Sequence, residues 1–254
     1  TALARLLCLP AEEALPAIRT KLDRAGKGAR LPLLMALTWF GDHSGVPELL
    51  QALNELALQS QASEWDAAGR PTGGFHETVS TYWRVNQLII LLGLSRDPRA
   101  LEPLCRIAKS TETGGEVNVS PRLHWRRIPN YDRIVALCFA LERIADPQAA
   151  QALDALLSRL SGHVETEALD GRTNYAMALL EVTVARTLAR CAGVRGAEVL
   201  ADYVEDVRFV LADHARRELE AVTGQDLGYE KSAWQDWISR HALEPRPYTD
   251  VELY

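Results

Sequence analysis

The chain has 254 residues, of which 47% are hydrophobic and 24% are charged, and its formal net charge is −6. This composition is typical of a folded protein and excludes wholesale disorder. No stretch of about eighteen apolar residues occurs without a charge, so we expect no membrane-spanning helix. The acidic balance argues against a broad basic surface for nucleic acid or for an anionic membrane.

Helical patterns follow one another along the chain in similar pairs. Each pair is an apolar helix, a break, and a second apolar helix, with almost no strand pattern between. Two copies are most alike, since Tyr82 and Tyr131 lie forty-nine residues apart and each precedes an Asp-Pro pair by fifteen residues. In chain order, the breaks fall at Gly41-Asp42, Asp97-Pro98, Asp146-Pro147 and Ala192-Gly193.

The residues at these breaks explain the turn between the two helices. Proline cannot continue a helix and disfavours helical geometry in the residue before it. Aspartate suits the N-cap of the next helix, and proline suits its first turn. Neither helix buries its apolar face alone, so neighbouring pairs must stack. The sequence therefore predicts an all-α fold, a right-handed α-solenoid of about four antiparallel helix pairs that forms a single domain over residues 1–254.

This pattern resembles HEAT-type repeats, which are helix pairs with an Asp-Pro-like turn before the second helix. The resemblance implies a HEAT- or armadillo-like array, whose period of about fifty residues slightly exceeds the usual length. The excess falls in polar segments at residues 59–78, 110–130 and 161–173, which we expect to be loops. Such loops either carry recognition residues at one edge of the array or merely cover it.

The C-terminal part departs from the repeat. Gly224 fits a helix C-cap, and Trp234 and Trp237 share one face of a short amphipathic helix. We expect residues 220–254 to form a capping helix and an extended tail, and residues 223–237 resemble the closing unit of bacterial HEAT-repeat proteins. Residues 200–219 are similar to the helical region downstream of bacterial FAD-dependent oxidoreductase domains. That likeness implies flavin chemistry in another domain, because this chain has no Gly-x-Gly-x-x-Gly after a strand.

Metal and cofactor motifs are not evident in the sequence. Its four cysteines are far apart without a CxxC pair, which argues against a zinc ribbon and fits small core residues in a reducing, cytoplasmic compartment. His76-Glu77 is similar to the iron-binding dipeptides of HEAT-type deoxyhypusine hydroxylases, but those proteins need several such dipeptides. Asp213 and Arg217 fit a surface ion pair better than an acid–base pair. We expect no metal, no cofactor and no catalytic residue.

Six residues are candidate contacts for a partner. Arginines beside aromatic residues favour binding interfaces, although the same mixture suits a small anion, a nucleic acid or simple loop packing. The repeated Tyr-x-Arg motif places one arginine at the same point of successive pairs, either as a rim of positive charge for an acidic or peptide ligand or as a bond to a carboxylate such as Glu142 or Glu181. The six candidates are Arg84, His124, Trp125, Arg127, Tyr131 and Arg133.

The sequence favours a non-catalytic protein-interaction or scaffold module. The chain begins without methionine, which fits a processed chain or a fragment of a longer protein. We expect the helical C-terminal domain of a larger bacterial protein, with a stand-alone module as the other reading. Its partner would be a protein, a peptide or a fused catalytic domain, and not a nucleic acid or a membrane. The alternative is an enzyme: an FAD-dependent oxidoreductase-associated domain, a bilin lyase, or a DNA glycosylase, whose basic groove the net charge opposes.

Overall fold

The computed structural model describes residues 8–62, 75–113, 117–118, 126–127, 130–166 and 171–249. The regular structure of these residues is helical, apart from one antiparallel pair of two-residue strands, β1 (Val117–Asn118) and β2 (Arg126–Arg127). The predicted all-α class is therefore confirmed. The chain divides into two compact units, Thr1–Pro103 and Leu104–Tyr254, and each is described by itself. The prediction of a single domain stays a prediction.

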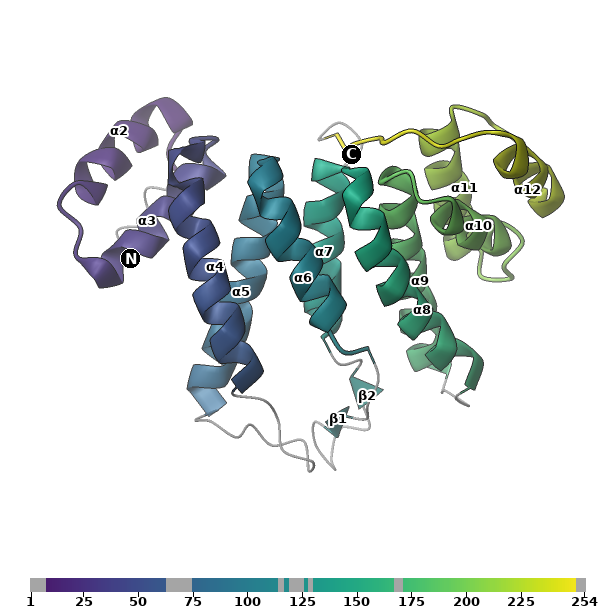
Figure 1. The fold of residues 1–254 in the computed structure, drawn as a ribbon, viewed down its shortest axis with the longest axis horizontal. Helices are drawn as coiled ribbons and strands as arrows, with labels where there is room; N and C mark the ends of the chain where they lie inside the picture. The colour runs from purple at the N-terminus through teal and green to yellow at the C-terminus, as the bar shows by residue number, and fades with distance from the viewer. Residues whose placement is uncertain are drawn as a thin grey trace. The chain divides into compact units, whose positions relative to one another are not determined.

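The first unit is built around α3, which packs against α2, α4 and α5, while α4 also packs against α5 (Figure 1). Leucines on these helices form its core, and Leu37, Leu49, Leu53 and Leu88 are almost fully buried. Its elements are α2 (Ala11–Leu22), α3 (Lys27–Trp39), the 3-10 turn η1 (His43–Gly45), α4 (Val46–Ala62), α5 (Phe75–Ser95), the 3-10 turn η2 (Pro98–Ala100) and the start of α6 (Leu101–Ser110).

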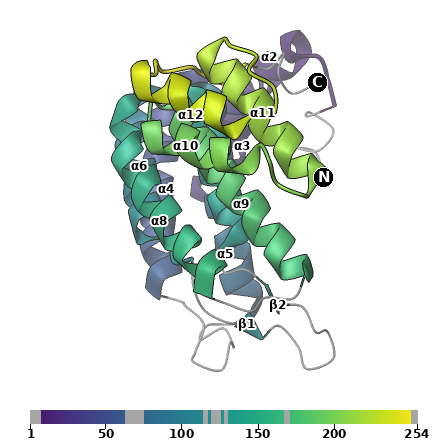
Figure 2. The ribbon, with the colours of Figure 1, turned by 90° about the vertical axis from the view of Figure 1, so that its right-hand side faces the viewer.

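The second unit is built around α9, which packs against α7, α8, α10 and α11. Figure 2 shows α12 lying across α10, and there Trp234 is fully buried and donates its indole N–H to the carbonyl of Gly228 at 2.9 Å. The elements are α7 (Tyr131–Ile144), the 3-10 turn η3 (Pro147–Ala149), α8 (Ala150–Thr166), α9 (Gly171–Arg190), α10 (Val194–Tyr203), α11 (Phe209–Thr223) and α12 (Lys231–Arg240).

An aspartate forms the same turn before α4, α6 and α8. The side chains of Asp42, Asp97 and Asp146 accept a hydrogen bond from the backbone N–H two residues later, at 3.0, 2.9 and 2.8 Å. Each aspartate caps a three-residue 3-10 turn, after which the α-helix begins. The expected aspartate caps are thus present, with a 3-10 turn between the cap and the helix.

Two of the three expected loops are shorter than the sequence suggested. Helix α4 continues to Ala62 and α5 starts at Phe75, while α8 continues to Thr166 and α9 starts at Gly171. The few apolar residues of these segments have no helical period, so the sequence pattern does not show that the helices continue through them.

Candidate functional site

The structure does not gather the six sequence candidates into one described site. Arg84 lies exposed on α5 in the first unit, whereas Tyr131 and Arg133 lie half-buried in the first turn of α7 in the second. Burial, with a smaller effect of Asp132, raises the pKa of Tyr131. Arg127 is paired with Val117 in the β1–β2 ribbon, and its side chain is outside the described part. His124 and Trp125 also lie outside the described residues. Their contact role stays a prediction.

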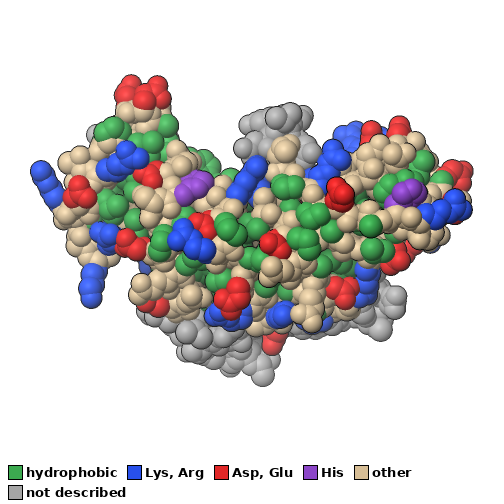
Figure 3. Space-filling model, turned by 45° about the horizontal axis from the view of Figure 1, so that its top comes forward, with side chains coloured by type: hydrophobic (Ala, Val, Ile, Leu, Met, Phe, Trp, Pro, Cys, Tyr) green, Lys and Arg blue, Asp and Glu red, His purple; other side chains and the backbone are tan. Residues whose placement is uncertain are grey.

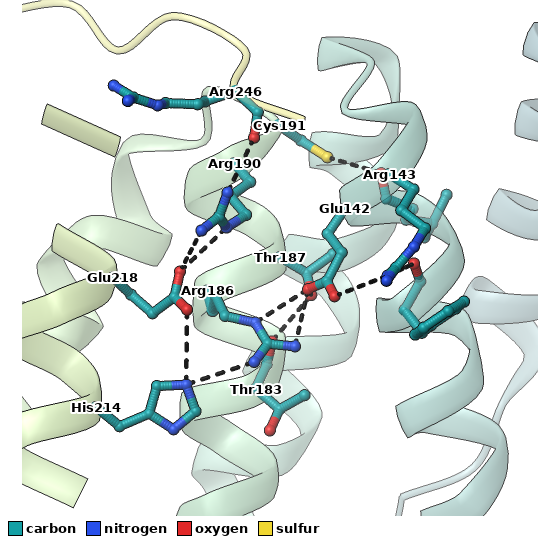
Figure 4. Close-up of polar contacts among 12 residues, drawn as sticks. Glu142, Arg143, Thr183, Arg186, Thr187, Arg190, Cys191, His214, Glu218 and Arg246 are labelled. Atoms are coloured by element: carbon teal, nitrogen blue, oxygen red, sulfur yellow. Dashed lines mark hydrogen bonds and ion pairs between the residues drawn. The ribbon is translucent and has the colours of Figure 1, made fainter. Parts of the chain in front are cut away.

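A different set of charged residues comes together where α7, α9, α11 and the C-terminal tail meet (Figure 4). Three of them, Arg143, Arg186 and Arg190, are here named the arginine cluster. Arg186 and Arg190 are four residues apart on α9, so their side chains lie on the same face of that helix. Arg143 is on the last turn of α7, and its guanidinium carbon lies 3.5 Å from the ring centre of Phe139.

Arg186 joins α9 to α7. Its Nη2 lies 2.8 Å from Oε2 of Glu142, and its Nε donates to the same oxygen at 3.0 Å. Glu142 has only 3% of its side chain exposed. Burial, partly opposed by the charge of Arg186, raises the pKa of Glu142. Burial disfavours the positive form of Arg186 as well, but Glu142 and Glu218 outweigh it and raise the pKa of this guanidinium.

Arg190 joins α9 to α11. Its Nε and Nη2 both donate to Oε2 of Glu218, at 3.0 and 2.9 Å, and the two side chains are 1% and 8% exposed. Nε2 of His214 lies 3.8 Å from the other oxygen of Glu218 and 3.4 Å from Nη1 of Arg186. Burial acts to raise the pKa of Glu218, but His214, Arg190 and Arg186 together outweigh it and hold that pKa below its usual range. Glu218 is therefore a carboxylate, and the arginines hold it ionised.

The C-terminal tail, residues 243–249, runs from α12 past the ends of α9 and α7 (Figure 1). The backbone N–H of Arg246 donates to the carbonyl of Arg190, and that of Tyr248 to the carbonyl of Glu142, both at 2.8 Å. The guanidinium carbon of Arg190 lies 4.2 Å from the ring centre of Tyr248, with those of Arg186 and Arg143 at 5.5 and 5.7 Å. The three arginines thus surround one aromatic ring, which is favourable because the ring face is electron-rich.

The site is suited to recognition of a flat, electron-rich group and of an extended backbone. Within the described residues, the three guanidinium groups face the two carboxyl groups of Glu142 and Glu218. On the face drawn in Figure 3, acidic, basic and apolar side chains of the described residues are interspersed, without a broad basic field. Within the described part of the chain, no group of three or more histidine, cysteine, aspartate or glutamate side chains could hold a metal ion.

One feature of the sequence indicates this cluster. Arg186 and Arg190 are spaced four apart in a helix whose neighbouring residues are largely apolar, and charges in such a place are expected to pair with a neighbouring helix. The ion pair predicted between Asp213 and Arg217 is confirmed at 2.9 Å, with Arg217 70% exposed. None of the four cysteines, all within the described residues, forms a disulfide; Cys138 and Cys191 are buried as expected, whereas Cys8 is exposed.

Comparison of the chain with protein-family models, with curated proteins and with solved structures finds no match. Among the described residues, no helix is both long and apolar enough to cross a membrane.

Proposed function

We propose that the chain is a protein-interaction module, a right-handed solenoid of antiparallel HEAT-type helix pairs that binds an extended segment of a protein partner. The partner is either a separate protein or a catalytic domain of the same polypeptide, and the place of action is the cytoplasm. The repeated aspartate-capped turn before α4, α6 and α8 supports the repeat architecture.

One observation carries the proposal: the second unit already holds an extended polypeptide, its own tail. Two backbone N–H groups of the tail reach the carbonyls of Arg190 and Glu142, at the C-terminal ends of α9 and α7. The last carbonyls of a helix have no partner within the helix, so they are available to a chain that passes across it. Nη1 of Arg190 in turn donates to the carbonyl of Arg246 at 3.4 Å.

The arginine cluster adds selectivity to this backbone recognition. A guanidinium group combines a flat stacking surface with several directed donors, which is why arginine is common where proteins bind one another. The net charge of −6 disfavours a nucleic acid as the partner. A protein segment is therefore the ligand class that the charge and geometry support best.

Affinity capture from the source cells, with quantitative mass spectrometry, tests this function. The bait is the chain itself, compared with Arg190→Lys, in which one ammonium cannot hold Glu218 and reach the tail carbonyl together. The matched control is Arg195→Lys, because Arg195 forms an exposed pair with Asp154 at 2.9 Å in the same unit. We expect a partner that wild type and Arg195→Lys retain and Arg190→Lys loses, with similar circular dichroism and thermal unfolding for all three. Identical partner sets for the three baits would refute the proposal.

A further inference from the structure

The tail meets the helices in a regular two-residue register. Arg246 and Tyr248 turn their N–H groups to the helix ends, whereas the residues before each of them, Pro245 and Pro247, have no N–H. In an extended chain, alternate residues point their backbone groups to opposite sides. Proline thus stands where a donor would turn away from the helices, and it favours the extended conformation before binding.

The atoms that receive the tail do not depend on its side chains. They are the backbone carbonyls of Glu142 and Arg190, and the side chain of Arg246 is exposed. Sequence selectivity comes instead from the position of Tyr248, whose half-buried ring lies among the three guanidinium groups. A ligand for this place needs two N–H groups at alternate residues and an aromatic ring on the second.

We propose that the carbonyls of Glu142 and Arg190 and the arginine cluster form a recognition site for an extended, proline-containing peptide with one aromatic residue, and that segment 243–249 occupies this site in competition with a partner. This inference rests on the proposed interaction function and names its ligand class. The segment is suited to displacement because most of it is exposed: of its seven residues, only Leu243 is buried and only Tyr248 is half-buried.

A labelled peptide added to the full chain tests the site. The probe is a fluorescent peptide of residues 243–249, Leu-Glu-Pro-Arg-Pro-Tyr-Thr, and the readout is fluorescence polarisation. Tyr248→Ala in the chain weakens the attached tail but leaves the receiving atoms intact. In wild type, the attached tail competes with the probe at a high effective concentration. Tyr248→Ala removes the contacts between the tail's ring and the guanidinium groups, so the tail competes less well. We therefore expect the probe to bind Tyr248→Ala about tenfold more tightly than wild type.

Variants of the probe separate backbone from side-chain recognition. Replacing its arginine with alanine should leave binding unchanged, because that side chain is exposed in the bound tail. Replacing the same arginine with proline removes the N–H that reaches Arg190 and should weaken binding about tenfold, as should replacing the tyrosine with alanine. Equal binding of the alanine and proline probes would overturn the proposed register.

The matched control in the chain is Tyr229→Ala. Tyr229 is 43% exposed and its ring lies 5.5 Å from the guanidinium carbon of Arg216, so it is a tyrosine–arginine contact away from the tail. This variant should bind the probe as weakly as wild type. If Tyr248→Ala unfolds, Arg246→Pro in the full chain loosens the tail through the backbone alone and should raise probe affinity in the same way.

The two proposals fail separately. Equal probe affinity for wild type and the tail-loosened variant, or no binding to either, overturns the inference on the ligand class. If the partner capture still depends on Arg190 in that case, the interaction function stands and the ligand is of another kind. Tighter probe binding to Tyr248→Ala, with the expected order of the probes, supports the site whether or not a cellular partner is captured.

Discussion

Replacing Arg190 with methionine should destabilise the second unit strongly. Glu218 receives two hydrogen bonds from Arg190 and is 8% exposed, so removal of the guanidinium leaves a buried carboxylate without its main partner. Breaking a buried pair from one side costs about 3–5 kcal/mol, a large part of the stability of an ordinary domain. His214, with Nε2 at 3.8 Å from Glu218, lies too far away to replace both bonds.

The double variant Arg190→Met/Glu218→Met gives the sharper result. Apolar side chains of similar volume need no charge partner, so we expect the double variant to be more stable than Arg190→Met alone by about 2 kcal/mol or more. Urea unfolding followed by circular dichroism measures both, with the slope of the transition as a check that the same surface is exposed.

The exposed pair Arg195–Asp154 is the control for this cycle. Its side chains are 42% and 46% exposed, and its nitrogen–oxygen distance of 2.9 Å equals that of the Arg190–Glu218 pair. Burial is then the main difference, and the Arg195–Asp154 coupling should stay below about 1 kcal/mol. If Arg190→Met lowers the free energy of unfolding by less than about 1 kcal/mol, or if the double variant is less stable than Arg190→Met, the cluster is not held as a buried charge network.

Three further predictions concern packing, pH and thiol reactivity. Gly196→Ala should destabilise the unit by several kcal/mol in urea unfolding, because a Cβ there would lie 2.4 Å from a carbonyl oxygen of α9; an unchanged midpoint would contradict this close helix crossing. Hydrogen bonds from the hydroxyl and the backbone N–H of Ser44, with a smaller effect of Arg19, lower the pKa of Asp42 from 3.8 to about 2. Its stabilisation is therefore present above pH 4 and is lost as the pH falls through 2. Asp42→Asn should therefore cost about 1–2 kcal/mol at pH 7 and almost nothing at pH 2, the upper value being discounted because Arg19 is 59% exposed. Iodoacetamide at pH 8 should alkylate exposed Cys8 and spare Cys138, whose pKa burial raises to about 12, and mass spectrometry of the native protein would reveal any labelling of Cys138.

The local turns could be predicted because their causes are local. Asp97-Pro98 and Asp146-Pro147 set the end of one helix and the cap of the next within a few residues, and Gly224 takes the left-handed conformation with φ of 72°. Helix lengths were harder to predict from the sequence, because the ends of α4 and α8 extend beyond the periodic apolar residues that indicate a helix.

The charge cluster could not be predicted because its partners are far apart in the sequence. Glu142 and Arg186 come from different helices, and so do Arg190 and Glu218, and each pair depends on how α7, α9 and α11 pack. Arginines next to aromatic residues are the pattern visible in the sequence, and this pattern favours Arg133. On this pattern Glu142 is only a possible partner for such an arginine, whereas in the structure Glu142 binds Arg186.

The position of these charges argues for recognition more than for stability. A buried ion pair stabilises a fold little compared with well-packed apolar residues. Most of the core of this unit is apolar, with Leu153, Leu156 and Leu188 almost fully buried, and Glu181 is a buried carboxylate outside the cluster that accepts a hydrogen bond from Tyr203. The arginine cluster lies under the extended segment that crosses α7 and α9 within the described part of the chain, and Arg190 contacts both Glu218 and that segment. A cluster that only joined helices would not need contacts with the ring of Tyr248. A site that binds an extended peptide with an aromatic residue needs them, and the peptide experiment distinguishes the two.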